Sequence, residues 1–246
     1  MTTILALDSS SENCSVAVYH EHTVTLRSKY APRQHTQLIL PLLKQELESR
    51  NLVLADIDVI AFGCGPGSFT GIRIAAGVAQ GLAFGLNIPI YAISNLQALA
   101  LQSYLENGVS QVLACIDARM GEVYWGLFQV SSEKIPYFDS PEQHFMRYTV
   151  NPMLAEQVCS PEHVSVCFME QAKNLNSAGI GSGLNLLPPE LLQSLSQIDT
   201  ESQPNADTVA YLADTAKASG LVGDMQDALP SYVRDTVTWN KLPGRE

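Results

Sequence analysis

The chain has 246 residues, of which 46% are apolar and 16% are charged, a balance typical of a globular protein and not of a disordered one. Its 25 acidic and 14 basic residues give a formal net charge of −11. Proteins that bind nucleic acid broadly need clustered Lys and Arg, so this charge argues against direct contact with a phosphate backbone.

The five cysteines are odd in number, and no two of them have the C-x-x-C spacing. We therefore expect free, mostly buried thiols in a reducing, cytoplasmic compartment. The histidines form no H-E-x-x-H or H-x-x-x-H pair, so no metal site is predicted. The sequence shows no secretory signal, and its most apolar helix, over residues 72–86, is too short for a membrane span, so no membrane association is expected.

The first half alternates strands and helices, as in an α/β protein. In chain order we predict strands over 3–7, 14–19 and 23–29, a helix over 36–49, a strand over 57–62, a helix over 72–86, a strand over 88–93, and a helix from Ser94 or Asn95 to 105.

The pattern then restarts after a polar, glycine-bearing break at 106–108. The first strand ends at Asp8 before a tight turn and a return strand, and a strand over 111–116 ends in the same way at Asp117. This weak internal repeat predicts two lobes, an N-terminal one over 1–106 and a C-terminal one over 107–246.

The second lobe is less regular. We predict a return strand over 122–130, a loop or irregular strands over 131–143, short helices over 151–158 and 189–195, a strand over 177–183 closed by a glycine turn, a helix over 207–218, and a poorly ordered end over 239–246.

The repeated aspartates are the first candidates for chemistry. Carboxylates facing each other across a cleft between the lobes could hold Mg²⁺ through water while turn amides contact phosphates. Asp8, Ser9, Ser10 and Asp117 are therefore candidates for a vestigial nucleotide site. The competing interpretation is that Asp is simply a favourable turn residue.

A glycine-rich turn, CGPGSFTGIR at 64–73, lies between the strand over 57–62 and the helix over 72–86. It fits neither a Walker A loop, since no Gly-Lys-Ser/Thr follows, nor G-x-G-x-x-G, since Thr70 stands at the third glycine. The motif therefore gives only weak support for a phosphate site at this turn.

The helix behind this turn carries Gly77, Gly81 and Gly85 at intervals of four. Glycine inside a helix costs about 1 kcal/mol relative to alanine, so a compensating close approach of another backbone is expected. That backbone belongs either to this chain or to a partner helix. Candidate interface residues are Leu38, Leu42, Phe69, Gly71, Ala75, Gly77, Val78, Gly81 and Gly85.

Four segments together resemble the TsaB (YeaZ) family of bacterial tRNA threonylcarbamoyladenosine biosynthesis. They read ILALDSS at 4–10, GPGSFTGIR at 65–73, IDARMGEVY at 116–124 and PSYVR at 230–234. The resemblance implies a two-lobe actin/hexokinase/Hsp70-like (ASKHA) fold with ribonuclease H-like, duplicated β-β-β-α-β-α lobes.

The resemblance also implies a non-catalytic paralogue of TsaD, the subunit that threonylcarbamoylates adenosine 37 in tRNAs reading codons that begin with A. Such proteins pair with a TsaD-type transferase through helices of the N-terminal lobe, are joined by a TsaE-type ATPase, and also form homodimers. They meet tRNA only indirectly and need no cofactor. TsaD-type proteins carry an H-x-x-x-H pair on the helix after the Ile-Pro strand, whereas this chain has no histidine between His35 and His144.

Two alternatives remain open. One is an ATPase or phosphotransferase of the ASKHA class that uses Asp8 and Asp117. The other is direct tRNA binding, which the net charge of −11 disfavours.

Overall fold

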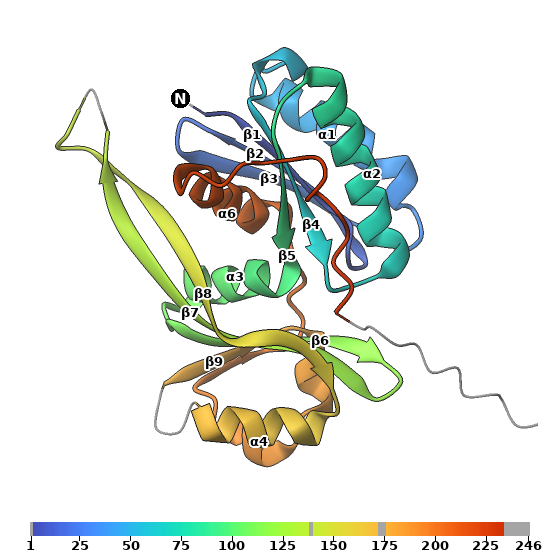
Figure 1. Cartoon of the computed structure of the whole chain (residues 1–246), viewed down its shortest axis with the longest axis vertical. Coiled ribbons are helices and arrows are strands. Elements are labelled where there is room, and N and C mark those ends of the chain that lie inside the picture. Colours follow the sequence, from blue (N-terminus) through green and yellow to red (C-terminus); the bar gives the residue numbers. More distant parts are fainter. Residues whose placement is uncertain (1, 138–139, 172–175, 234–246) are drawn as a thin grey trace, which may run out of the picture.

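The computed structural model describes residues 2–137, 140–171 and 176–233. The predicted poorly ordered end at 239–246 lies outside these residues. Two five-stranded sheets lie one above the other, with helices between them and on their outer faces (Figure 1).

The first sheet has the strand order β3-β2-β1-β4-β5. β1 pairs antiparallel with β2 and β2 with β3, while β4 lies parallel to β1 and β5 parallel to β4. The strands are β1 (Ile4–Asp8), β2 (Asn13–His20), β3 (Thr23–Tyr30), β4 (Val59–Gly65) and β5 (Ile90–Ser94).

The second sheet repeats this topology, since its order β10-β9-β6-β7-β8 read backwards is β8-β7-β6-β9-β10. β6, β7 and β8 form the antiparallel part, and β9 and β10 add parallel to it. The strands are β6 (Gln111–Arg119), β7 (Glu122–Pro136), β8 (His144–Cys159), β9 (Ser177–Ile180) and β10 (Gln197–Asp199). The duplicated sheets confirm the two-lobe ASKHA fold.

Helices cover the outer face of each sheet. α1 (His35–Ser49) and α2 (Phe69–Leu86) pack on the first sheet, where Leu43 and Ala79 belong to one buried apolar cluster with Phe62 of β4. α4 (Pro161–Gln171) and α5 (Pro189–Gln193) pack on the second sheet around the buried Trp125. There are also two short 3₁₀ helices in the described residues. η1 (Leu54–Asp56) lies between α1 and β4, and η2 (Ser182–Leu186) lies between β9 and α5.

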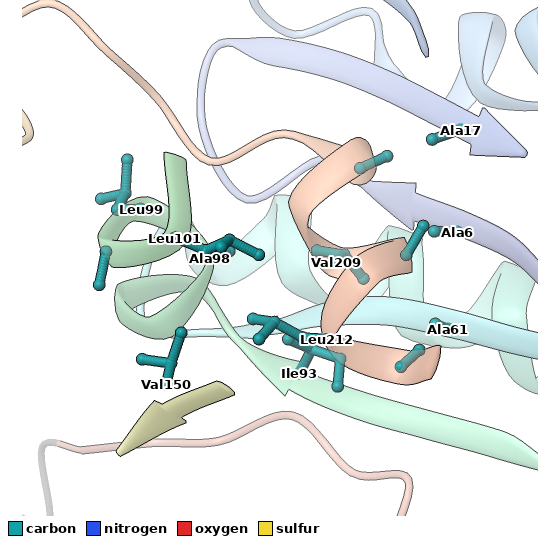
Figure 2. Close-up of a cluster of buried hydrophobic side chains, with 14 of the residues drawn as sticks. Ala6, Ala17, Ala61, Ile93, Ala98, Leu99, Leu101, Val150, Val209 and Leu212 are labelled. Carbon is teal, nitrogen blue, oxygen red and sulfur yellow. The ribbon is translucent and has the colours of Figure 1, made fainter. Parts of the chain in front are cut away.

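α3 (Asn95–Asn107) and α6 (Ala206–Ala218) fill the space between the sheets. Figure 2 shows Leu101 of α3 and Val209 of α6 in one cluster with Ala6 of β1. The division at residue 106 falls at the end of α3 and separates the strands of the two sheets. α6, from the C-terminal part, nevertheless packs against the first sheet.

Helix starts follow from their caps. The Ser94 hydroxyl accepts hydrogen bonds from the N–H groups of Leu96 and Gln97, so Ser94 is the cap of α3 and Asn95 its first residue. The Ser68 hydroxyl accepts from the N–H of Gly71, so α2 begins at Phe69, three residues before the predicted start.

One expectation for the second lobe is wrong. Residues 151–158 are not a helix, because they belong to β8, which pairs antiparallel with β7. Residues 131–143, expected as a loop or irregular strands, divide into 131–136, which continue β7, and a connection before β8 in which residues 137 and 140–143 are not strand. The helix-favouring run around Leu154 is overridden by pairing with β7 opposite Leu127. Pro152 is tolerated because β8 is an edge strand with an irregular register there. The sequence reading also missed α4, although Pro161 at its first turn and the pair Val164 and Phe168 on one face are helix signals.

Candidate functional site

A cleft of about 800 Å³ lies between the two lobes. Its walls include the turns that the sequence repeat singled out. The β1–β2 turn contributes Ser10 and Ser11, the glycine turn contributes Gly67 and Ser68, and the end of β6 contributes Asp117. This cleft is where an ASKHA nucleotide site is expected.

Asp8 does not line the cleft, because it is fully buried beneath the β1–β2 turn. Its Oδ1 accepts hydrogen bonds from the N–H and the hydroxyl of Ser10, at 3.0 and 2.9 Å. Burial raises the pKa of the Asp8 carboxyl to about 7, although the Ser10 hydrogen bonds lower it in part. The carboxyl therefore carries a proton in a large share of molecules near neutral pH.

The surroundings of Asp8 favour the neutral form. Asp8 Oδ2 and Asn95 Oδ1 both lie beside Gly63, where any Cβ would collide with them. Within the described residues Asn95 Oδ1 has no donor, and it lies on the same side of Gly63 as Asp8 Oδ2. The nearby thiols of Cys14 and Cys64 are neutral as well, since burial raises their pKa values to about 11 and about 12. Asp8 thus acts as a buried structural acid.

Asp117 lies on the cleft wall but is bound to its own turn. Its carboxylate accepts from the N–H of Arg119 at 2.7 Å and from Nη1 of Arg119 at 3.1 Å. Its own N–H donates to the Ser182 hydroxyl at 3.2 Å. The two aspartates of the repeat therefore do not face each other, since one is buried and the other partly exposed.

The glycine turn and the β1–β2 turn bond to each other. Ser9 Oγ donates to the Gly71 carbonyl at 2.8 Å, and the Ser68 N–H donates to the Ser10 carbonyl at 2.6 Å. The Gly71 N–H is taken up by the Ser68 hydroxyl. A phosphate site needs free N–H and O–H donors, and these three donors are already used within the chain.

Glycine is required at Gly67 and Gly71 by this close approach. A Cβ at Gly67 would lie 2.6 Å from the Ser10 carbonyl oxygen, and one at Gly71 would collide with the Ser9 carbonyl oxygen. The turn is thus a backbone-to-backbone junction at the start of α2.

α2 has two different faces. Gly71, Ile72, Ala75 and Ala79 are buried on the side of the helix that packs on the first sheet. Gly77, Gly81 and Gly85 are exposed, and among the described residues no heavy atom outside their own helix lies within 4 Å of where their Cβ atoms would be. Close packing against the described part of this chain, the first explanation for the glycine ladder, therefore does not account for these three residues.

The candidate interface residues divide in the same way. Leu42, Gly71 and Ala75 are buried inside the chain, so they support the helices from within and are not available to a partner. The residues that remain at the surface, partly or fully exposed, are Leu38, Phe69, Gly77, Val78, Gly81 and Gly85.

The sequence analysis did not identify Phe84, whose side chain is 76% exposed beside Gly85. The signal that could have found it is a bulky aromatic residue at a helix position next to the glycines. The contact between Arg73 and Tyr232 was also missed. Arg73 Nε donates to the Tyr232 hydroxyl at 2.9 Å, and the Arg73 guanidinium lies 3.6 Å from the centre of the Phe69 ring. Both residues stand in the segments that carried the family resemblance.

Among the described residues, no group of three or more His, Cys, Asp or Glu side chains is arranged to hold a metal ion. α2 is long and apolar enough to cross a membrane by length and composition alone. One side of it is buried against the first sheet.

The chain is similar to known proteins over almost its whole length. Residues 21–241 match the family model of TsaD, described as tRNA N6-adenosine threonylcarbamoyltransferase. The tRNA threonylcarbamoyladenosine biosynthesis protein TsaB of Haemophilus influenzae is 40% identical over 99% of this chain and 98% of its own length. The TsaB of Escherichia coli is 39% identical over 99% of both.

A solved structure agrees with these relatives. YeaZ from Pseudomonas aeruginosa superposes with a TM-score of 0.79 at 37% identity, covering 94% of this chain and all of that one. With the duplicated sheets and the motif-bearing turns, these matches show that the chain belongs to the TsaB (YeaZ) family.

Proposed function

We propose that this chain takes part in tRNA threonylcarbamoyladenosine biosynthesis as a non-catalytic subunit that binds and activates a TsaD-type transferase together with a TsaE-type ATPase. Its relatives are named for that biosynthesis. The partners, and a homodimer formed through a similar surface, are part of the proposal. tRNA is met only through the complex, which we expect in the cytoplasm.

The observation that carries this proposal is the open glycine face of α2, formed by Gly77, Gly81 and Gly85. Each glycine costs helix stability, and the described chain offers no contact that compensates. Glycines at this spacing let a second helix approach closely, so that its backbone and side chains pack against the bare helix surface. The exposed Phe84 beside them supplies an aromatic anchor of the kind that dominates binding energy.

The residues at the cleft favour a subunit over a catalyst. Asp8 is buried and neutral in a large share of molecules, Asp117 is bound to Arg119, and the N–H groups of Ser68 and Gly71 in the glycine turn donate within the chain. The helix that follows the Ile-Pro strand begins Asn95-Leu96-Gln97-Ala98 and has none of the imidazoles that a TsaD-type metal pair requires.

The test is calorimetric titration of a purified TsaD-type subunit with the wild-type chain and with Gly81→Phe. The bulky ring should lower the affinity at least tenfold and leave the thermal unfolding midpoint within about 2 °C, because the position is solvent-exposed. Glu170→Phe on α4, exposed on the other lobe, is the matched control and should bind like wild type. Unchanged affinity of Gly81→Phe would overturn the proposed face.

The second candidate is an ATPase or phosphotransferase that works in the inter-lobe cleft, and the size of that cleft is the observation in its favour. Titration of the isolated chain with ATP and Mg²⁺ separates the two. Micromolar binding that is lost in Asp117→Ala, which changes a residue of the cleft wall, would favour the enzyme.

A further inference from the structure

The segment after α6, residues 221–233, crosses the first lobe and lies beside α2 (Figure 1). It begins at the exposed edge of the first sheet, because β5 is the last strand there. The Tyr91 hydroxyl donates to the Leu221 carbonyl at 2.8 Å, and the Ile90 N–H donates to the Gly223 carbonyl at 3.3 Å. A Cβ at Gly223 would lie 2.8 Å from the Ile90 carbonyl oxygen, so the crossing is closely packed.

The segment then holds the middle of α2. Gln80 Nε2 donates to the Ala228 carbonyl at 2.7 Å. Ala228 is buried in the same apolar cluster as Ala79, beneath the helix. Its carbonyl therefore holds the helix at Gln80, on the flank between the buried face and the open glycine face, while its side chain belongs to the buried cluster.

The last contacts reach the start of α2. The Ser231 N–H donates to the Cys64 carbonyl at 2.8 Å, and the backbone passes where a Cβ of Gly65 would stand. Tyr232 then accepts the hydrogen bond from Arg73 and lies 5.7 Å from the Phe69 ring, centre to centre. Arg73 begins the exposed row that continues as Gly77, Gly81 and Gly85.

We propose that residues 221–233 form a strap that positions α2 and thereby the open glycine face, with Gln80 and Tyr232 as its two side-chain fastenings. The role in partner binding rests on the proposed function, whereas the positioning of α2 does not. Helix-into-helix packing tolerates little displacement, so a partner that uses the glycines depends on where α2 is held. Gln80 and Tyr232 are positioning residues in this scheme.

The test uses the full chain and native-state hydrogen exchange. Gln80→Glu keeps the shape of the side chain but replaces the amide donor by a carboxylate, which is repelled by the Ala228 carbonyl. The α2 amides should then exchange about tenfold faster, while those of α3 stay unchanged. Gln45→Glu, the same change at an exposed position of α1, is the control and should leave α2 unaffected.

The double variant Gln80→Glu/Tyr232→Phe should exchange faster still in α2. Equal α2 rates in wild type and in the double variant would overturn the strap, and so would an equal rise in α2 and α3, which would mark a global effect. In the same samples, the affinity for the TsaD-type subunit should fall about tenfold without a change at the glycines. Faster α2 exchange with unchanged affinity would support the strap and overturn the proposed contact face.

Discussion

The two faces of α2 use small residues for opposite purposes. On the packed face, Gly71 is forced by the Ser9 carbonyl, and Ala75 and Ala79 lie against the sheet. On the open face, Gly77, Gly81 and Gly85 meet none of the described atoms beyond their own helix. Small residues on the packed face therefore mark a close approach within the chain, whereas those on the open face have no such contact among the described residues and are the basis of the proposed partner surface.

The largest effect is expected on the packed face. Gly71→Ala should lower the free energy of unfolding by about 4 kcal/mol, because the new Cβ would collide with backbone and not with a movable side chain. Urea unfolding followed by circular dichroism measures it. A loss below about 1 kcal/mol would mean that the two turns separate easily and are not a rigid junction.

The buried carboxyl of Asp8 should make the free energy of unfolding depend on pH, by roughly 3 kcal/mol. Burial raises the pKa of Asp8 to about 7 from 3.8, so the folded state keeps a proton that the unfolded state releases. The free energy of unfolding should therefore fall as pH rises from about 4 to about 7. Asp8→Asn should flatten this slope in urea unfolding series.

Asp117→Asn, the same substitution at the corresponding place in the other lobe, is the control, and the slope of Asp8→Asn should be flatter than that of Asp117→Asn. If Asp8→Asn leaves the slope unaltered, Asp8 is ionised in the folded protein, and burial does not raise the pKa of its carboxyl.

On the open face, the expected effect is on binding and not on folding. Phe84→Ser should lower the affinity for the TsaD-type subunit about tenfold, because the aromatic ring is 76% exposed in this chain and a partner would bury it. Its unfolding midpoint should stay near wild type. Val166→Ser, which changes a 56% exposed side chain on α4, should alter neither quantity in the same calorimetric and thermal assays.

The smallest effect is a gain in stability. Gly85→Ala should raise the free energy of unfolding by about 0.7 kcal/mol, since alanine favours the helix and its Cβ meets open space. Compared with Gly71→Ala, the same substitution thus changes sign between the two faces. A destabilising Gly85→Ala would show that the end of α2 is constrained in a way that its exposure does not reveal.

Most of the first lobe could be predicted from sequence because its strands are continuous apolar runs with clear turns, as at Asp8 and at the glycine turn. The long β8 could not be predicted in this way. Its helix-favouring residues pair with β7, as Leu154 does with Leu127, and such a pairing extends beyond the short window that a local pattern covers. The place of α6 between the lobes is equally invisible, since amphipathicity says that a face is buried but not against which sheet.

The candidate site was predicted in part. The aspartate repeat and the glycine ladder were found by pattern, and Asp117 does line the cleft. That Asp8 is sealed beneath its turn, and that Leu42, Gly71 and Ala75 face inward, depends on three-dimensional packing. The meeting of Arg73 with Tyr232 joins segments 159 residues apart, a distance that no local pattern spans.

The position of α3 and α6 between the two sheets has a consequence for how this chain folds during its translation. β1 leaves the ribosome long before α6, which covers its inner face and begins only at Ala206. Until that point the inner face of the first sheet lacks its helix, and apolar residues such as Ala6 and Ala17 stay uncovered. Because such distant contacts slow folding and leave the nascent sheet prone to aggregation, we expect this lobe to mature only after α6 has been translated.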